Sequence, residues 1–398
     1  MDKKPEKLVP EVRFKGFTDD WEQHKLEEMA EIVRGASPRP IKDKKWFDSN
    51  STIGWIRISD VTAQNGRIYH LSQHISKLGQ QKTRVVIQPH LLLSIAASVG
   101  YPVINYIPTG VHDGFLIFNN PKFNINYMFY WLRKYQTNWK KYGQPGSQVN
   151  LNSSIVSNTK VRLPSLDEQA TISNIFYQID KILSLQQRKL EQLKQLKKAM
   201  LQQLFVDKNN KQPNSRFKNF KGNWEQHRLE EVAQVTMGQS PSSKNYTDNP
   251  NDYVLVQGNA DLKSNKISPR VWTKEITKQV HKGEIIMTVR APVGYLAMAN
   301  MDAVIGRGVA AIDGNKYLYY LLQTKLMDRT WEKLSSGSTF ESISSNDIKN
   351  LEIKVTETEE EKLITKLMNT VTYFVTLQKN NLTQLTTLKK YLLQNLFI

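Results

Sequence analysis

Two histidine patterns have residue types that could bind a metal ion or transfer protons. His70 and His74 stand four residues apart, which would place both rings on one face of a helix, as in some zinc sites. No H-E-x-x-H string surrounds them, and the 398-residue chain has no cysteine to complete a structural zinc site. His24 and His227 each lie in the string WEQH, where a packed or capping histidine is expected. The pattern therefore predicts no metal ligands.

Two further strings could belong to a nuclease or a DNA methyltransferase. Asp347 with Glu360-Glu361-Lys362 loosely resembles a metal-dependent nuclease core, but carboxylates at 357–361 are explained by a helix start, whose dipole they complement. Asn120-Pro121-Lys122-Phe123 lacks the second proline of the tetrad that holds a flipped base in amino-methyltransferases. No G-x-x-x-x-G-K-[ST] phosphate loop is present, and no G-x-G-x-x-G follows a strand. We therefore predict a non-catalytic chain without cofactor or metal.

The charge of the chain points to a polyanionic partner. Lys and Arg number 55 against 37 Asp and Glu, which gives a net charge of +18. Residues 1–164 carry 23 basic and 13 acidic side chains, residues 165–222 carry 11 and 5, and residues 223–398 carry 21 and 19. Nucleic acid is the usual partner of such an excess. We expect the first half and the middle of the chain to supply most of the electrostatic attraction.

Polar, basic and aromatic residues interleave in loops that could hold phosphates and read base edges. They lie at 39–45 and 140–152 in the first half, and at 240–246 and 333–342 in the second. Because the second half is nearly neutral, it should rely more on uncharged hydrogen bonds. The predicted DNA-binding residues are Arg39, Lys42, Lys44, Lys45, Lys140, Lys141, Tyr142, Gln144, Ser147, Gln148, Asn150, Ser242, Ser243, Lys244, Asn245, Tyr246, Arg290, Lys333, Ser336, Ser338 and Thr339.

The segments that must position these loops are duplicated in the sequence. Residues 13–38 (RFKGFTDDWEQHKLEEMAEIVRGASP) and 216–241 (RFKNFKGNWEQHRLEEVAQVTMGQSP) share 15 of 26 positions. The string Val-Gly-Tyr recurs at 99–101 and 293–295, and Gly-Ser at 146–147 and 337–338. A period of about 190 residues exceeds that of solenoid repeats, so the pattern indicates a duplicated domain.

Each copy ends in a long amphipathic segment. Ser165-Leu-Asp-Glu168 and Thr356-Glu-Thr-Glu359 fit the capping box that begins a helix. Apolar residues then follow at mostly three- and four-residue steps, and they recur 192 positions later, as in a coiled coil. The predicted seam and docking residues are Ile172, Ile175, Ile179, Ile182, Leu190, Leu193, Leu196, Leu204, Ile364, Leu367, Val371, Phe374, Leu382, Leu385, Leu388 and Leu396.

Such a seam must be buried, either in a homodimer or within one chain. The polar linker 207–222, with Pro213 and Gly222, favours an intramolecular antiparallel pair with an approximate two-fold axis. Short β-rich runs (53–58, 84–87, 253–256, 284–289 and 351–355) and helical runs (26–32, 229–235, 127–135 and 317–327) predict α/β or α+β globular units. The predicted division is an N-terminal segment 1–20, globular domains 21–163 and 223–355, helices 165–206 and 356–398, and the linker.

Three negative features indicate the compartment. No run approaches the roughly 18 consecutive apolar residues of a membrane span. The start, MDKKPEKLVP, has no apolar signal region, and the absence of cysteine fits a reducing environment. We expect a cytoplasmic protein without membrane contact.

The chain resembles the specificity (S) subunits of type I restriction–modification systems over nearly its whole length. The resemblance rests on RFKGFTDDWEQHKLEE and its echo RFKNFKGNWEQHRLEE, on the Gly-x-Ser-Pro after each, and on LPSLDEQATI before the first long helix. One departure is the second pre-helix string, VTETEEEK, which lacks the proline and the Glu-Gln pair of LPSLDEQ.

The resemblance implies two target recognition domains that each read one half of a bipartite double-stranded DNA sequence. It implies that the helices form an antiparallel spacer that fixes the gap between half-sites and docks two modification subunits. Restriction subunits are the further partners that it implies. S-adenosylmethionine, ATP and Mg²⁺ would bind to those partners, and the assembled complex would methylate adenine and cleave DNA. The competing hypothesis is a nucleic-acid-binding structural protein without restriction partners, and a fused nuclease or methyltransferase ranks third.

Overall fold

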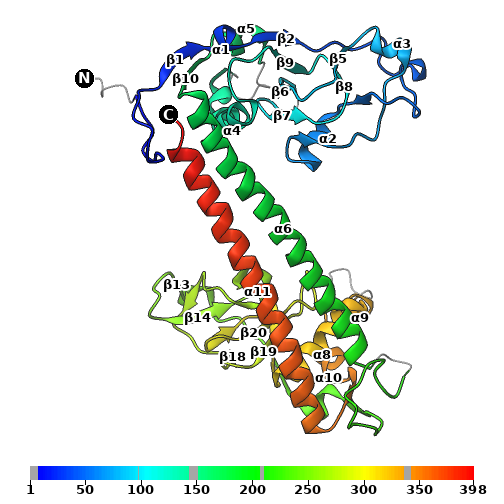
Figure 1. The fold of residues 1–398 in the computed structure, drawn as a ribbon. Coiled ribbons are helices and arrows are strands. Elements are labelled where there is room, and N and C mark those ends of the chain that lie inside the picture. The colour runs from blue at the N-terminus through cyan, green and yellow to red at the C-terminus, as the bar shows by residue number, and fades with distance from the viewer. Residues whose placement is uncertain (1–7, 97, 143–150, 207–209, 336–341) are drawn as a thin grey trace. The chain divides into compact units, whose positions relative to one another are not determined.

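The computed structural model describes residues 8–96, 98–142, 151–206, 210–335 and 342–398. It divides into two units, one of Met1–Gln187 with Asn381–Ile398 and one of Arg188–Asn380. Each unit holds a mixed α/β globular part and segments of two long helices, α6 (Leu166–Leu204) and α11 (Thr358–Asn395) (Figure 1). The duplicated architecture with a long helix after each globular part is confirmed.

The first unit is built on a five-stranded sheet of order β2-β9-β6-β7-β4 and a three-stranded sheet of order β3-β8-β5. The helix α4 packs beside β6 and β7. The elements are β1 (Glu22–Lys25), α1 (Leu26–Met29), β2 (Glu31–Arg34), η1 (Lys44–Trp46), β3 (Gly54–Trp55), α2 (Ile58–Ala63), β4 (Arg67–Ile68), α3 (Lys77–Gln80), β5 (Arg84–Val86), β6 (Leu91–Ser94), β7 (Pro102–Asn105), β8 (Thr109–Val111), β9 (Phe115–Asn119), α4 (Ile125–Tyr135), η2 (Gln136–Tyr142), α5 (Ser153–Ser157) and β10 (Lys160–Leu163).

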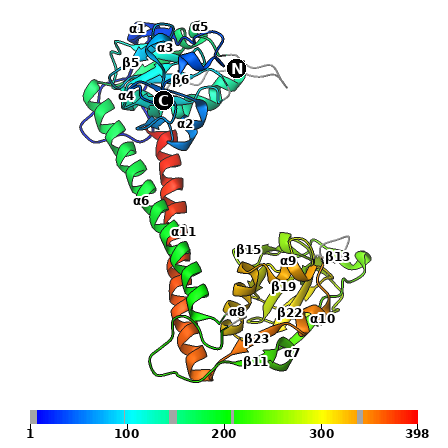
Figure 2. The same cartoon turned by 90° about the vertical axis from the view of Figure 1, so that its right-hand side faces the viewer.

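The second unit repeats this plan with a four-stranded sheet, β12-β22-β19-β20, and a five-stranded sheet, β13-β17-β14-β21-β18 (Figure 2). In both units a short strand pairs in parallel with its neighbour, β3 with β8 and β14 with β21. The elements are β11 (Glu225–Arg228), α7 (Leu229–Val232), β12 (Gln234–Met237), η3 (Ser243–Asn245), β13 (Tyr246–Thr247), β14 (Tyr253–Val256), η4 (Asn259–Asp261), β15 (Leu262–Lys263), β16 (Lys266–Ile267), β17 (Trp272–Thr273), β18 (Gln279–Val280), β19 (Ile285–Thr288), β20 (Leu296–Met298), β21 (Ala303–Ile305), β22 (Val309–Asp313), α8 (Lys316–Met327), α9 (Thr330–Ser335), α10 (Ser345–Lys349) and β23 (Glu352–Val355).

Several predicted elements are shorter than their sequence patterns suggest. The strand at 253–256 is confirmed as β14, whereas only Gly54–Trp55 of the run 53–58 forms a strand. Ile58 instead begins α2, because the Asp60 carboxylate accepts a hydrogen bond from the Arg57 backbone N–H and so starts a helix. The helices predicted at 26–32 and 229–235 end at Met29 and Val232, where the chain turns into β2 and β12.

The duplicated WEQH strings form the strands that close each unit. Strand β1 pairs antiparallel with β10, with His24 opposite Val161, and β11 pairs with β23, with His227 opposite Ile353. Since β10 and β23 directly precede the long helices, each unit ties its first strand to the start of its helix. His24 and His227 lie beside glutamates of their own segments and are half-buried.

In each repeat, an arginine binds a glutamate in the first turn of that repeat's long helix. Arg13 donates from Nε and Nη2 to the carboxylate of Glu168, both at 2.8 Å. Arg216 makes the same bidentate contact with Glu360, also at 2.8 Å twice. Glu168, 1% exposed, therefore does not act as the reciprocal partner of the predicted capping box, and Glu359, the partner predicted in the second repeat, pairs with Lys362. The Ser165 hydroxyl does accept from the Glu168 backbone N–H, at 3.3 Å.

The Arg216–Glu360 pair forms although the second pre-helix string departs from the first. VTETEEEK lacks the Glu-Gln pair of LPSLDEQ, yet its Glu360 takes the place of Glu168, exactly 192 positions later. The Thr356 hydroxyl bonds to this carboxylate instead of to a backbone N–H.

Distant parts of the chain complete each hydrophobic core. Leu396 and Phe397, at the end of α11, are buried with Trp21 and Phe176 in the first unit. Leu201, Leu204 and Phe205, at the end of α6, are buried in the second unit with Trp224 and Ile364. Because buried apolar surface contributes about 25 cal/mol per Å² to the free energy of folding, these helix ends stabilise each unit.

The repeated Val-Gly-Tyr strings mark a close approach that only glycine permits. Gly100 and Gly294 have φ of +75° and +80°, values that L-residues with a side chain rarely adopt. A Cβ on either would lie within 2.1 or 2.5 Å of the indole of Trp139 or Trp331. The repeat therefore preserves a tryptophan packed on a glycine turn, although the sequence between the anchors diverges.

Candidate DNA interface

An open hollow of about 690 Å³ lies on the first unit and contains two of the predicted DNA-binding residues, Lys42 and Lys44. It draws on three separate stretches of the chain. Its lining residues are Ile41, Lys42, Lys44, Phe47, Asp48, Ser49, Trp55, Arg57, Ser72, Gln73 and His74. Three of them are cationic and Asp48 is the carboxylate among these described residues, so the hollow combines positive charge with the aromatic rings of Phe47 and Trp55.

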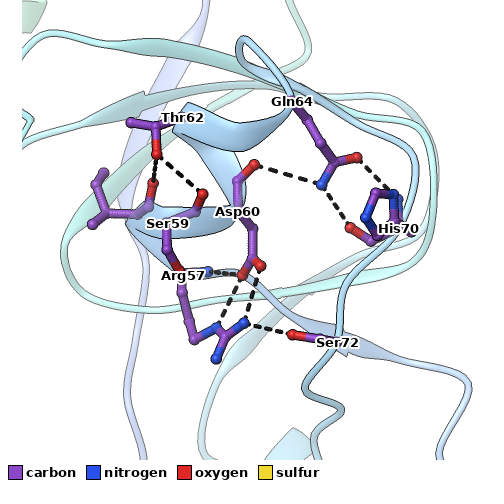
Figure 3. A network of polar contacts seen from close by, with 8 residues as sticks. Arg57, Ser59, Asp60, Thr62, Gln64, His70 and Ser72 are labelled. Carbon is purple, nitrogen blue, oxygen red and sulfur yellow. Dashed lines mark hydrogen bonds and ion pairs between the residues drawn. The ribbon is translucent and has the colours of Figure 1, made fainter. Parts of the chain in front are cut away.

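Arg57 is held at this hollow by its own helix. Its Nε and Nη2 donate to the Asp60 carboxylate at 3.1 and 3.0 Å, and Nη2 also reaches Ser72 Oγ at 2.5 Å (Figure 3). The hydrogen bonds that Arg57 donates to Asp60 raise the pKa of Arg57 above its ordinary value. The guanidinium, exposed at 44% of its side chain, is thus a preoriented cation.

Gln64 fixes the loop that carries Ser72 and His74. Its Oε1 accepts from the backbone N–H of Tyr69 and of His70, at 2.9 and 3.2 Å. Its Nε2 donates to the His70 carbonyl at 2.8 Å (Figure 3). These bonds keep the hollow's wall in one conformation.

The other two predicted cations of the first loop have internal partners. Arg39 Nη2 contacts Asp113 Oδ2 at 2.5 Å. The Lys45 ammonium lies 2.8 Å from Asp43 Oδ2 and 4.6 Å from the Trp46 ring centroid. Hydrogen bonds from Lys45 hold the pKa of Asp43 below its ordinary value. Lys42 and Lys44 are the members of this loop that face the hollow.

The corresponding loop of the second unit is more polar and partly internal. Glu275 accepts from the Ser242 backbone N–H at 2.8 Å and from Asn245 Nδ2 at 2.7 Å. The Tyr246 hydroxyl accepts from Gln257 Nε2 at 2.8 Å. Ser242, Ser243 and Lys244 are exposed, whereas Asn245 and Tyr246 are half-buried.

The remaining predicted residues fall into two groups. Arg290 is exposed, and its backbone bridges to Ser342, whereas Lys333 is exposed on α9. Lys140, Lys141 and Tyr142 lie on η2, but the positions of their side chains are not described. Gln144, Ser147, Gln148, Asn150, Ser336, Ser338 and Thr339 lie outside the described residues.

Sequence reasoning missed Arg57, Trp55 and the wall at 72–74. Arg57 and Asp60 stand three residues apart, the spacing of a helical ion pair, and this was the available signal. Trp55 and His74 carried none, because their approach to Lys42 depends on long-range folding.

Seven of the predicted seam residues are buried, and the other nine are half-buried or exposed. Ile172, Ile179, Leu190, Leu204, Ile364, Val371 and Leu396 are buried. Ile175, Leu193, Leu367, Leu382 and Leu385 are half-buried. Ile182, Leu196, Phe374 and Leu388 are 42–47% exposed, and Tyr177, Leu185, Tyr373, Leu377 and Tyr391 are exposed apolar neighbours on the same helices.

The residues that suggested other chemistry have structural roles. Asp347 accepts from Ser344 at the start of α10, and Glu360 binds Arg216, so they are not one acidic cluster. Lys122 follows a turn, where its N–H bonds to the Met29 carbonyl. Among the described residues, no group of His, Asp and Glu could hold a metal ion. No helix in the described ranges is long and apolar enough to cross a membrane.

A family model decides which family has this architecture. The type I restriction modification DNA specificity domain matches residues 18–195 and again residues 221–387. The chain belongs to this family. Its two specificity domains coincide with the two repeats, so the duplication found in the sequence is a duplication of the specificity domain.

A similar specificity subunit spans nearly the full chain, and a second one matches less than half of it. A putative type I restriction enzyme MjaX specificity subunit of Methanocaldococcus jannaschii is 27% identical over 94% of this chain and 91% of its own length. The MjaIX specificity subunit of the same organism is 30% identical over 43% of this chain and 42% of its own length.

Two solved structures share the specificity-subunit fold. The type I restriction–modification S subunit of M. genitalium superposes with a TM-score of 0.64 at 14% identity, over 98% of this chain and 99% of that one. A chain from a study of type I R-M complex assembly and conformational transition gives 0.60 at 22%, over 96% and 98%.

Proposed function

We propose that this specificity subunit reads a bipartite DNA target, with one half-site recognised by each specificity domain. The observation that carries the proposal is the conserved scaffold with unlike loops: a cationic hollow around Arg57 in the first unit, and a polar, nearly neutral loop at 242–246 in the second. Cations hold phosphates, and arginine, serine and asparagine read base edges. The chain itself performs no covalent chemistry.

We further propose that modification subunits, two per complex, and restriction subunits dock on the long helices. The support is the set of exposed apolar side chains on α6 and α11, such as Leu185 and Tyr373, which are 57% and 62% exposed. Exposed apolar side chains that recur along a helix are a common feature of protein interaction sites. S-adenosylmethionine, ATP and Mg²⁺ bind those partners, and the assembled cytoplasmic complex methylates adenine and cleaves DNA.

The test of target choice is single-molecule sequencing of adenine methylation in the host genome, with and without this gene. We expect a bipartite motif with a fixed gap that disappears on deletion. Exchange of residues 21–163 for another such domain should change one half-site only. Unchanged methylation on deletion, or a change in both half-sites on exchange, contradicts the proposal.

The test of docking is copurification of the modification subunit. Leu185→Asp with Ile182→Asp should abolish it, because charges on the exposed apolar face would be desolvated on binding. Ser184→Asp, an exposed residue of the same helix, is the matched control and should retain the subunit. Equal recovery with all variants contradicts docking at this face.

A further inference from the structure

A tyrosine of the first unit joins its globular part to both long helices. Tyr130, on α4, donates its hydroxyl hydrogen to Asp180 Oδ2 on α6 at 2.8 Å. The other oxygen of Asp180 accepts from Lys389 Nζ on α11 at 2.5 Å. The Lys389 ammonium also lies 5.8 Å from the Tyr130 ring centroid. Asp180 therefore bonds the recognition domain to one helix and that helix to the other.

A buried arginine depends on the same carboxylate. Arg67, on β4, is 8% exposed, and its Nη2 donates to the Tyr130 hydroxyl at 3.1 Å. Its guanidinium carbon lies 4.7 Å from the Phe129 ring centroid and 5.4 Å from that of Tyr177 on α6. In the described part of the chain, Arg67 donates hydrogen bonds to Tyr106, Asn126 and Tyr130, and the Asp180 carboxylate is linked to it through the tyrosine.

The side chains around Tyr130 (Asp180 and Lys389) are called the first joint here. The second unit has a corresponding second joint around Tyr320, in which a hydroxyl takes the place of the carboxylate. Tyr320, on α8, donates to Asn369 Oδ1 at 3.0 Å, and its hydroxyl also forms a hydrogen bond with the Thr372 hydroxyl at 3.3 Å, both on α11. Lys197 of α6 lies 5.6 Å from the Tyr320 ring centroid, as Lys389 does at Tyr130. Thr372 stands 192 positions after Asp180, and Lys389 stands 192 after Lys197. The duplication has kept the tyrosine and the lysine and exchanged an acid for a hydroxyl.

Replacing the carboxylate by a hydroxyl changes the strength of the hydrogen bonds at the second joint. No ion pair is recorded for Lys197 in the described part of the chain, and burial lowers the pKa of its ammonium. Hydrogen bonds to charged groups are stronger and more directional than those between neutral groups. The first joint thus resists reorientation of its domain more than the second.

We propose that Asp180 is a positioning residue: with Tyr130 and Lys389 it fixes the first recognition domain on its two helices, and it thereby sets how strictly the complex demands one gap length between half-sites. This proposal rests on the proposed function, because a gap exists only for a bipartite target. Asp180 touches no DNA in it and acts through Tyr130.

The experiment uses the full chain assembled with its modification subunits. Methylation is measured on DNA carrying the native target, the target with its gap changed by one base pair in either direction, and the target with a substituted half-site base. Asp180→Asn should raise methylation at the altered gaps relative to the native gap about tenfold, since a charge-assisted bond is lost. Discrimination against substituted bases should stay unchanged.

The controls separate positioning from folding. The conservative variant Asp180→Glu keeps a carboxylate that can accept from both Tyr130 and Lys389, and it should retain gap discrimination. Thr372→Asp, which gives Lys197 a partner, should sharpen that discrimination. If Asp180→Asn lowers methylation on every DNA equally, or leaves the gap ratio unchanged, the proposal is wrong. If wild-type complexes methylate no bipartite motif, the proposed function itself fails, which is a distinct result.

Discussion

Arg57 differs from the lysines of the same hollow because its guanidinium is already oriented by Asp60 and Ser72. A guanidinium that is already oriented loses little conformational freedom when its Nη1, which Asp60 and Ser72 do not use, donates to a base edge. Arg57→Lys keeps the charge and removes this oriented planar group, so affinity for the target should fall about tenfold, within the roughly 1–3 kcal/mol of a base contact. Binding to unrelated DNA should change little.

Equilibrium binding to target and scrambled duplexes checks this prediction. Arg162→Lys, on β10 and not a lining residue of the hollow, is the matched control. Asp60→Asn should act in the same direction as Arg57→Lys, because it frees the guanidinium. A wild-type ratio of specific to unspecific affinity for Arg57→Lys would remove Arg57 from base recognition.

Glu360 makes the second unit sensitive to acid. Burial opposes its charge, but hydrogen bonds from Arg216 and Thr356 outweigh burial and leave its pKa below the ordinary value. A lowered folded-state pKa contributes stability that is present above the unfolded pKa of about 4.3 and is lost as pH falls through the folded value. Between about pH 5 and pH 3, wild-type protein should therefore lose stability faster than Glu360→Gln.

Urea unfolding at stepped pH measures this difference. Glu359→Gln is the matched control, because Glu359 is 72% exposed and pairs with Lys362 at the surface. At neutral pH, Glu360→Gln should be destabilised by about 3 kcal/mol, since it leaves the Arg216 charge without its buried partner. Parallel acid profiles for wild type and Glu360→Gln would contradict the role assigned to this pair.

At the scale of elements, the long helices were predictable and the sheets were not. Apolar positions that recur after 192 residues define the helices locally, because each seam residue lies within one or two turns of the next. The strands are two to five residues long, and pairs such as β3 with β8 join residues 55 positions apart. Their order depends on long-range contacts that no local pattern reports. For the same reason only part of the hollow was predicted from the sequence. Lys42 lies in a charged loop that the sequence reveals, whereas Trp55 and His74 are brought to the hollow by long-range contacts.

Lengthening the helices tests whether their length sets the gap between the two half-sites, that is, whether they act as a ruler. Seven residues add about 10.5 Å of helix, roughly three base pairs of DNA. One heptad inserted in α6 alone, after Arg188, shifts the seam against α11 and should destroy methylation. Heptads in both helices, the second after Asn380, keep the seam in register and should restore methylation on a target with a longer gap. Methylation sequencing reads the new gap, and an unchanged gap in the double insertion would reject the ruler.

At the scale of the whole molecule, the uneven charge predicts two different modes of DNA binding. Residues 1–164 carry ten more basic than acidic side chains, whereas residues 223–398 carry two more. Each phosphate contact by a cation steepens the fall of log K with log salt by about 0.9. Lys42→Gln and Lys44→Gln should each reduce this slope by about that amount and weaken all sequences alike.

The second unit should respond in the opposite way. Ser242→Ala removes an uncharged group, so it should weaken binding to the target without altering the salt slope. Lys218→Gln, an exposed cation outside the predicted interface, should change neither quantity. Titrations from about 50 to 200 mM salt give both numbers for each variant. Equal slopes for Lys42→Gln and wild type would mean that the hollow does not face phosphates. If Ser242→Ala changes the slope of log K against log salt, the idea that the first domain binds mainly through charge and the second mainly through uncharged hydrogen bonds is wrong.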